Sequence, residues 1–247
     1  MLLEGRRVLV TGAASRRGIG QAACALFARH GAQVVALDLD ERGLADGPAA
    51  ASASALVACD VTSAEDCAAA ARKVGAEGGL DGLVHCAGVA APMRLAEIDR
   101  ASYDRMLDVN LWGTIQLTQA LAPLMTGRPD ASIVCLSSLA GQRGGGFVGG
   151  LHYAAAKAGV LGFVRGLARE LGPQGIRVNA VAPGLVDTDM TLPFMSSDQR
   201  EALAKQAPLG RLASADEVAS ACLFLVSSLA SYVTGATLDV NGGLHIH

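Results

Sequence analysis

The chain has 247 residues, which suits one large α/β domain, and no linker or shift in composition divides it. Its net charge is −3 and it has no basic run, which argues against nucleic acid and anionic membranes as partners. The six cysteines are scattered without a CxxC pair, so we expect reduced thiols in a cytoplasmic protein, with no disulfide frame. His245 and His247 alone make a weak metal site, and we expect no metal.

Short apolar segments alternate with longer helical patterns from end to end. Near-continuous apolar runs such as VLVTG and VVALD indicate strands buried on both faces, as in a parallel sheet covered by helices. We therefore predict an α/β fold with a Rossmann-type doubly wound parallel sheet of about seven strands and helices on both faces, in a single domain over 1–247. The predicted strands are 7–11, 33–37, 56–58, 82–86, 132–136, 177–181 and 237–240, and the predicted helices are 20–30, 64–74, 102–124, 153–171 and 216–225.

The first predicted strand runs into TGAASRRGIG and then into a helix. Gly12, Gly18 and Gly20 permit a tight turn and a close approach of the backbone to a pyrophosphate at the helix N-terminus. Asp38 stands at the end of the second strand, where a carboxylate can accept hydrogen bonds from an adenosine ribose or simply cap a turn. Asp60, after the third strand, has the same two interpretations, an adenine contact or a turn cap.

A tyrosine and a lysine stand four residues apart in the helical run LHYAAAKAGV. This spacing puts Tyr153 and Lys157 on one face of a helix. A nearby ammonium favours a phenolate and lowers its pKa toward the working range of a general acid/base. An isolated pair of this kind also fits an ordinary helix with a solvated lysine, so the chemical interpretation needs further residues in support.

Further segments complete a pattern that closely resembles the short-chain dehydrogenase/reductase family over nearly the whole chain. The glycine turn is two residues longer than the family's, and CAG at 86–88 stands where the family has NNAG. Asn110 in MLDVNLWG, Ser138 in IVCLSSLAG, RVNAVAPG and LDVNGG match family segments in order. The resemblance implies a catalytic tetrad of Asn110, Ser138, Tyr153 and Lys157. The cofactor contacts that it implies are Gly12, Arg17, Gly18, Ile19, Gly20, Asp38, Asp60, Val61, Ala87, Gly88, Tyr153, Lys157, Pro183, Gly184, Val186 and Thr188.

The resemblance also implies a mechanism for a secondary alcohol and a ketone that interconvert by hydride transfer to or from a nicotinamide. Ser138 would hold the substrate oxygen, and Tyr153 would take or return the proton. Lys157 would bind the nicotinamide ribose and lower the pKa of the tyrosine, while Asn110 would anchor a water that links Lys157 to solvent. Simple structural roles, a helix kink for Asn110 and a turn for Ser138, stay as alternatives.

The identity of the cofactor rests on two residues that point in opposite directions. Asp38 favours NAD because its charge repels a 2′-phosphate. Arg17, directly before Gly18, occupies a place where relatives that use NADP often carry a phosphate-binding base. Since one arginine on a lengthened turn would have to offset the carboxylate, we predict NAD, with NADP as the alternative.

The sequence defines the substrate less well than the chemistry. Residues 185–210 are predicted to form a lid over a small-molecule alcohol or ketone, with apolar side chains there and at Phe147 lining the pocket. An NADPH-dependent 3-oxoacyl thioester reductase is the alternative function, and a catalytically silent nucleotide-binding scaffold is the alternative of another class. The long helices 102–124 and 153–171 resemble those of the family's tetramer interfaces, so a homotetramer is expected, without nucleic acid or membrane partners.

Overall fold

The computed structural model describes residues 1–145 and 148–246. The prediction that Phe147 lines the pocket, and any role for His247, therefore fall outside the described residues. Within those ranges no helix combines the length and the apolar character that a membrane crossing requires.

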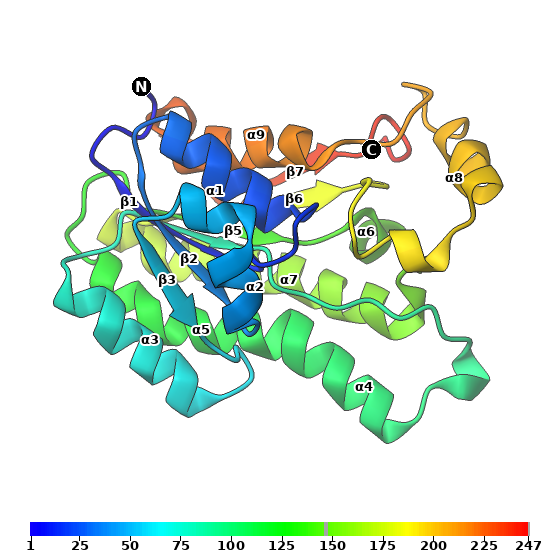
Figure 1. Cartoon of the computed structure of the whole chain (residues 1–247), viewed down its shortest axis with the longest axis horizontal. Helices are drawn as coiled ribbons and strands as arrows, with labels where there is room; N and C mark the ends of the chain where they lie inside the picture. The colour runs from blue at the N-terminus through cyan, green and yellow to red at the C-terminus, as the bar shows by residue number, and fades with distance from the viewer. Residues whose placement is uncertain (146–147, 247) are drawn as a thin grey trace.

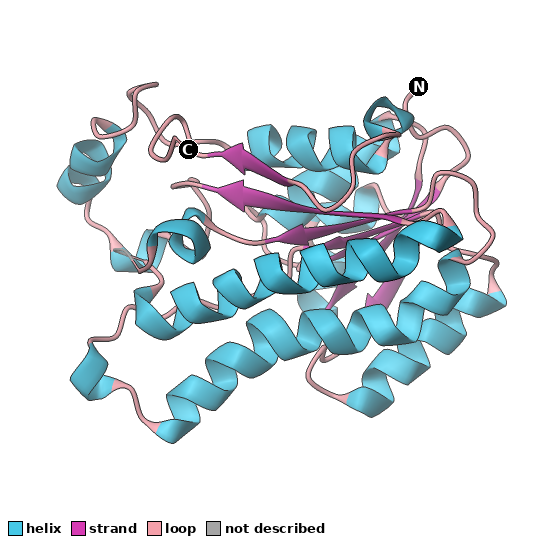
Figure 2. Cartoon of the chain, turned by 180° about the vertical axis from the view of Figure 1, so that it is seen from behind, coloured by secondary structure: helices cyan, strands magenta, loops and turns pink. Residues whose placement is uncertain are grey.

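Seven parallel strands form one sheet in the order β3-β2-β1-β4-β5-β6-β7 (Figures 1 and 2), so the predicted doubly wound sheet is confirmed. Their bounds agree with the predicted ones to within two residues. The chain crosses over after β3 to place β4 on the other side of β1, and this reversal creates the crevice in which such sheets bind ligands. The strands are β1 (Arg7–Thr11), β2 (Gln33–Asp38), β3 (Ala55–Ala58), β4 (Gly82–His85), β5 (Ser132–Leu136), β6 (Arg177–Pro183) and β7 (Thr237–Val240).

Helices cover both faces of the sheet, and each face has its own hydrophobic core. On one face α1 (Ile19–Arg29) and α9 (Ala215–Val226) pack over the strands. On the other face lie α3 (Ala64–Ala76), α5 (Gly113–Leu121) and α7 (Gly150–Leu171). Alternate residues of the strands other than β7 enter the two cores, which explains why those strands read as continuous apolar runs.

The predicted helix over 102–124 is wrong as a single element. The structure has α4 (Arg100–Leu107), a π-helical turn at Asp108–Trp112, α5 and a 3₁₀ turn at Ala122–Met125. A π-helical turn widens the helix by one residue without ending it. The apolar pattern therefore continues through the turn, and the sequence does not reveal that the helix changes type there. The turn contains Asn110, one of the four predicted catalytic residues.

Three short helices were not predicted: α2 (Glu41–Asp46), α6 (Leu139–Arg143) and α8 (Ser197–Ala204). Each shows too few turns for an apolar period to be visible. Their first residues are instead fixed by side-chain caps from Asp40, Ser138 and Ser196, respectively. In Figures 1 and 2, α6 and α8 lie at the carboxyl ends of the central strands, beside the site described next.

Candidate active site

A cavity of about 360 Å³ opens at the carboxyl ends of β5 and β6. Such a volume is typical of sites for small molecules. The structure brings together in its wall residues from the start of α1, the loop after β4, the ends of β5 and β6, α6, α7 and the segment after β6. The predicted site residues that line it are Ile19, Gly88, Ser138, Tyr153, Lys157, Pro183, Gly184, Val186 and Thr188.

Ser138 and Tyr153 meet across this cavity. Ser138 follows β5, and its Oγ caps α6 by accepting a hydrogen bond from the Ala140 N–H at 3.1 Å. Tyr153 lies in the first turn of α7 and is half-buried. Burial raises the pKa of the Tyr153 phenol, and a hydrogen bond with Ser138 lowers that pKa by less, so the pKa lies above its ordinary value. The predicted lowering of this pKa by Lys157 is corrected for the cofactor-free protein: the neighbour that lowers the pKa is Ser138.

Lys157 lies one turn further along α7 and is buried. Its Nζ donates a hydrogen bond to the Leu136 carbonyl at 2.9 Å and is 5.8 Å from the centre of the Tyr153 ring. Burial lowers the pKa of the Lys157 ammonium to about 8, because the low-dielectric surroundings disfavour the charged form. The sequence predicted the shared face of the pair, while the position of the ammonium over the ring and on a strand carbonyl comes from the packing of α7 against β5.

Replacing Lys157 with methionine is expected to stabilise the cofactor-free protein by up to about 3 kcal/mol at pH 7. Below pH 8 the lysine is charged in both the folded and the unfolded chain, so the folded state bears the full cost of burying the charge. Between pH 8 and the ordinary lysine pKa only the folded protein loses the proton, so the stability of the natural protein rises with pH. Urea unfolding at pH 7 and pH 10 measures the difference, which should shrink at pH 10.

Lys205→Met is the matched control for this prediction, because the Lys205 side chain is 71% exposed. Its effect on the free energy of unfolding should stay within about 0.5 kcal/mol at both pH values. A Lys157→Met protein that is less stable than the natural one at pH 7 would contradict the prediction.

Asn110 stands behind the cavity, fully buried in the π-helical turn. Its Nδ2 donates to the Val89 carbonyl at 2.9 Å, and its Oδ1 accepts from the Val89 N–H at 3.3 Å. These bonds hold the loop after β4 against the helix. A side chain at Gly88 would come within 2.7 Å of Asn110 Oδ1 and 3.5 Å of Lys157 Nζ, so Gly88 lets these two polar groups approach the same stretch of backbone.

The residues that replace the family's two asparagines before Ala87 have defined partners. His85 is buried and its Nε2 lies 2.9 Å from Thr118 Oγ1, while burial and the nearby Lys157 charge lower the pKa of its imidazole to about 3. The backbone N–H groups of Cys86 and Ala87 both donate to Thr11 Oγ1, at 3.0 and 2.9 Å. The hydrogen bonding behind the cavity is therefore supplied by a neutral histidine and a strand threonine.

The glycine turn is packed too closely for side chains at two of its glycines. Gly12 has a φ of +68°, and a Cβ there would lie 2.9 Å from the Ala87 nitrogen. A Cβ at Gly20 would lie 2.4 Å from the Gly12 carbonyl oxygen, so α1 packs directly on the turn. Gly18, at the N-cap of α1, has no side chain with which to cap the helix. The first N–H groups of α1 are thus left for an anion, and these residues fit the pyrophosphate of a dinucleotide.

Asp38 and Asp60 both cap backbone turns. Asp38 accepts hydrogen bonds from the N–H groups of Ala14, at 2.9 Å, and Asp40, at 3.1 Å, so it joins the end of β2 to the glycine turn. Asp60 accepts from the Thr62 N–H and hydroxyl, both at 2.8 Å. Capping is compatible with nucleotide contacts, since a carboxylate has further lone pairs. Val61 is buried, close to the start of α5.

Arg17, predicted as a cofactor contact, points to the segment after β6. Its guanidinium pairs with Asp187 at 2.5 Å, and its backbone N–H donates to Asp189 at 3.0 Å. Ser15 also donates to Asp189, at 2.9 Å, and Arg200 of α8 pairs with Asp187. These contacts of the glycine turn with Asp187 and Asp189, which we call the clasp, join the lengthened turn to the predicted lid. Sequence reasoning missed this clasp because its two halves are about 170 residues apart in the chain.

The other sequence predictions concern metals and thiols. All six cysteines are free thiols, and five of them are buried. In the part of the chain that the structure describes, no three histidine, cysteine or acidic side chains gather in a way that could hold a metal ion.

Comparisons with known proteins agree on one family. The profile described as enoyl-(acyl carrier protein) reductase matches residues 12–245. The uncharacterized short-chain type dehydrogenase/reductase y4mP of Sinorhizobium fredii is 46% identical, with 100% of both chains covered. The 3-oxoacyl-[acyl-carrier-protein] reductase FabG of Escherichia coli is 38% identical, again with 100% of both chains covered.

A solved structure adds the same information in three dimensions. The short-chain dehydrogenase/reductase named glucose/ribitol dehydrogenase from Brucella melitensis is 37% identical, with a TM-score of 0.92, and the match covers 100% of this chain and 99% of that one. Strand order and glycine turn define a Rossmann-type dinucleotide-binding protein. The chain belongs to the short-chain dehydrogenase/reductase family of oxidoreductases, whose members use NAD(P)H.

Proposed function

We propose that the protein is an NAD(H)-dependent oxidoreductase that interconverts a secondary alcohol and a ketone, with Tyr153 as general acid/base. One observation carries the proposal: Ser138 and Tyr153 lie together in the wall of a cavity that also receives Lys157 and the first residue of α1. A proton-transfer pair therefore adjoins a place shaped for a dinucleotide.

The residues divide the reaction between them as follows. A bound nicotinamide would accept hydride in the oxidation and supply it in the reduction. Ser138 would donate a hydrogen bond to the substrate oxygen and hold it beside the Tyr153 hydroxyl. In the reduction Tyr153 would give its proton to that oxygen, and in the oxidation it would take the proton back. Lys157 would add positive charge beside the phenolate, and Asn110 would keep the loop after β4 in place behind both groups.

Asp38 supports NAD over NADP, because it stands at the end of β2 in the position where a carboxylate faces an adenosine ribose. The Arg17 guanidinium pairs with Asp187 on the side of the lid, and this supports the same preference. The segment 185–210, with Thr188 and Val186 in the cavity wall, would act as the lid.

A second candidate, an NADPH-dependent 3-oxoacyl thioester reductase, is favoured by the full-length similarity to FabG of Escherichia coli. A catalytically silent scaffold is disfavoured, because the described residues retain Ser138, Tyr153 and Lys157 in mutual proximity.

The homotetramer stays a prediction. Two exposed aromatic side chains, Tyr103 of α4 (43% exposed) and Trp112 of the π-helical turn (45% exposed), would supply apolar surface to an interface between subunits.

Absorbance of NADH tests the proposal directly. The protein is incubated with NAD or NADP and a panel of secondary alcohols, and with NADH or NADPH and the matching ketones and a 3-oxoacyl thioester. We expect turnover with the non-phosphorylated cofactor and a simple alcohol or ketone. Turnover confined to NADPH and the thioester would transfer the assignment to the second candidate, and no turnover with any pair would favour the scaffold.

A further inference from the structure

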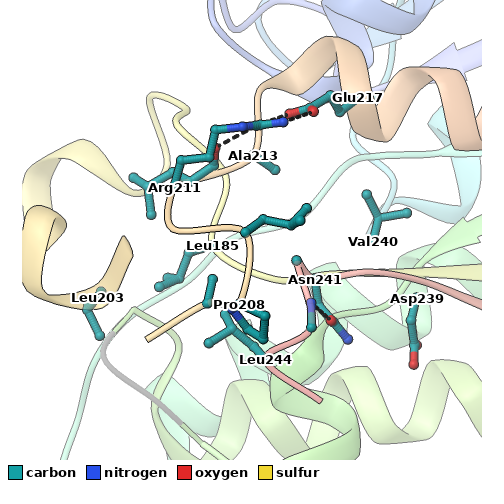
Figure 3. A pocket seen from close by; sticks show the side chains of 15 residues that line it. Leu185, Leu203, Pro208, Arg211, Ala213, Glu217, Asp239, Val240, Asn241 and Leu244 are labelled. Carbon is teal, nitrogen blue, oxygen red and sulfur yellow. Dashed lines mark hydrogen bonds and ion pairs between the residues drawn. The ribbon is translucent and has the colours of Figure 1, made fainter. Parts of the chain in front are cut away.

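A second cavity, of about 450 Å³, adjoins the active-site cavity. Leu185, Leu203 and Leu244 line both cavities, so they form the partition between the two. They come from three separate segments: the residues after β6, the end of α8 and the tail after β7. Figure 3 shows the second cavity, with the Arg211–Glu217 ion pair along one edge and Leu203, Pro208 and Leu244 toward the opposite edge.

The interior of the second cavity is suited to hydrocarbon. Its charged and polar side chains bond to one another or to other protein groups: Arg211 pairs with Glu217 at 2.6 Å, and Asp239 accepts a hydrogen bond from Gln142 at 2.7 Å. Asn241 bonds to the backbone of the C-terminal segment. What these groups leave for a ligand is apolar surface, which includes Ala207, Leu212 and Val240. Burying apolar surface of a ligand there is favourable, whereas a charged group would find no unpaired partner among the side chains just named.

The partition consists of three uncharged side chains from separate segments. Leu185 and Leu244 are half-buried, Leu203 is 9% exposed, and all three line both cavities. The cavity on the near side holds Tyr153 and Ser138, and the far cavity lies beyond the leucines. Between a substrate oxygen at Tyr153 and the second cavity there therefore stand three apolar side chains, Leu185, Leu203 and Leu244.

We propose that the two cavities form one substrate site, in which the reacting carbon lies at Tyr153 and an unbranched alkyl or acyl tail crosses the three leucines into the second cavity. The inference rests on the proposed function, because it places the reacting group at Tyr153. It narrows the substrate class to alcohols and ketones with an extended hydrocarbon tail.

Binding of unbranched 2-alkanones, from butanone to 2-decanone, to the protein saturated with NAD tests the inference by calorimetry. Both partners are oxidised, so no turnover occurs and the dissociation constant is read directly. We expect the dissociation constant to fall about fourfold for each added methylene once the tail reaches the second cavity. A dissociation constant that stays flat from pentanone upward overturns the inference, as does failure of every ketone to bind.

Two variants and a control locate the effect. Leu212→Trp, at a half-buried position outside the predicted lid that lines the second cavity and not the first, should abolish the gain for the long ketones and leave butanone binding unchanged. Should that variant fail to fold, Leu209→Glu puts a carboxylate at the exposed rim of the second cavity and should weaken 2-decanone binding at least threefold. Leu229→Glu, at an equally exposed leucine outside the cavity, should change nothing. Equal effects of Leu209→Glu on short and long ketones overturn the inference.

Measuring turnover of the same ketones with NADH distinguishes this inference from the proposed function. Chain-length-dependent binding without turnover in any case would leave the hydrocarbon site standing and reject the oxidoreductase assignment at Tyr153. Turnover with no dependence of binding on chain length would support the oxidoreductase assignment and reject the hydrocarbon site.

Discussion

Tyr153→Phe is expected to lower kcat by a factor of about 10²–10⁴, the usual contribution of a general acid/base. The substitution removes only the hydroxyl, so the ring still fills the wall of the cavity beside Ser138 and Lys157. Binding of the dinucleotide should change by less than about threefold, because the glycine turn and Asp38 are untouched. NADH absorbance gives kcat, and calorimetry gives the dissociation constant of the cofactor.

Tyr232→Phe is the natural control, since Tyr232 is fully exposed and lines neither cavity. It should leave both kcat and cofactor binding unchanged. Full activity of Tyr153→Phe would refute the proposed mechanism. Loss of cofactor binding together with activity would instead give Tyr153 a structural role.

The alternation of apolar strands and amphipathic helices was sufficient to predict the sheet, because a strand buried on both faces leaves a continuous apolar signature. β1, β5 and β7 begin and end where they were predicted. The shared face of Tyr153 and Lys157 was equally readable, since their spacing needs only helical geometry. The order of the matched segments along the chain supplied the family resemblance, and the family comparisons agree with that resemblance.

The properties that the sequence could not reveal depend on contacts between distant segments. The clasp of Asp187 and Asp189 on the glycine turn joins residues that no local pattern connects. The direction of the Tyr153 pKa shift depends on how deeply α7 packs, because burial and a neighbouring charge act on a phenol in opposite directions. The π-helical turn around Asn110 differs from a regular helix by a single residue per turn, below the resolution of an apolar period.

The short helices show the same limit in another form. α6 begins at Ser138 because that side chain caps it, so one residue both ends a strand connection and faces the cavity. A cap is visible in a sequence only when a clear helical period follows it. α6 is too short for that, so the sequence predicted a catalytic role for Ser138, with a turn as the alternative, and did not predict the helix that it caps.

Asp38→Asn is expected to narrow the preference for NAD over NADP by about a hundredfold. At roughly 5 Å and an effective dielectric constant of ~20, a carboxylate and a phosphate charge repel by on the order of 3 kcal/mol, which is close to two powers of ten in affinity. Asparagine keeps an acceptor oxygen for the Ala14 N–H, so the junction between β2 and the glycine turn should survive. Most of the change should therefore appear as tighter binding of NADP.

Calorimetry with NAD and NADP measures this change for the natural protein and for the variant. Asp40→Asn is the matched control: it removes a carboxylate two residues away, and asparagine still caps α2 at the Gly43 N–H. The control should retain the preference for NAD. If Asp38→Asn binds NADP no better than the natural protein does, charge repulsion at the ribose is excluded as the basis of selection. The clasp then becomes the feature to test, because Asp187 keeps Arg17, the cation next to Gly18, paired on the side of the lid.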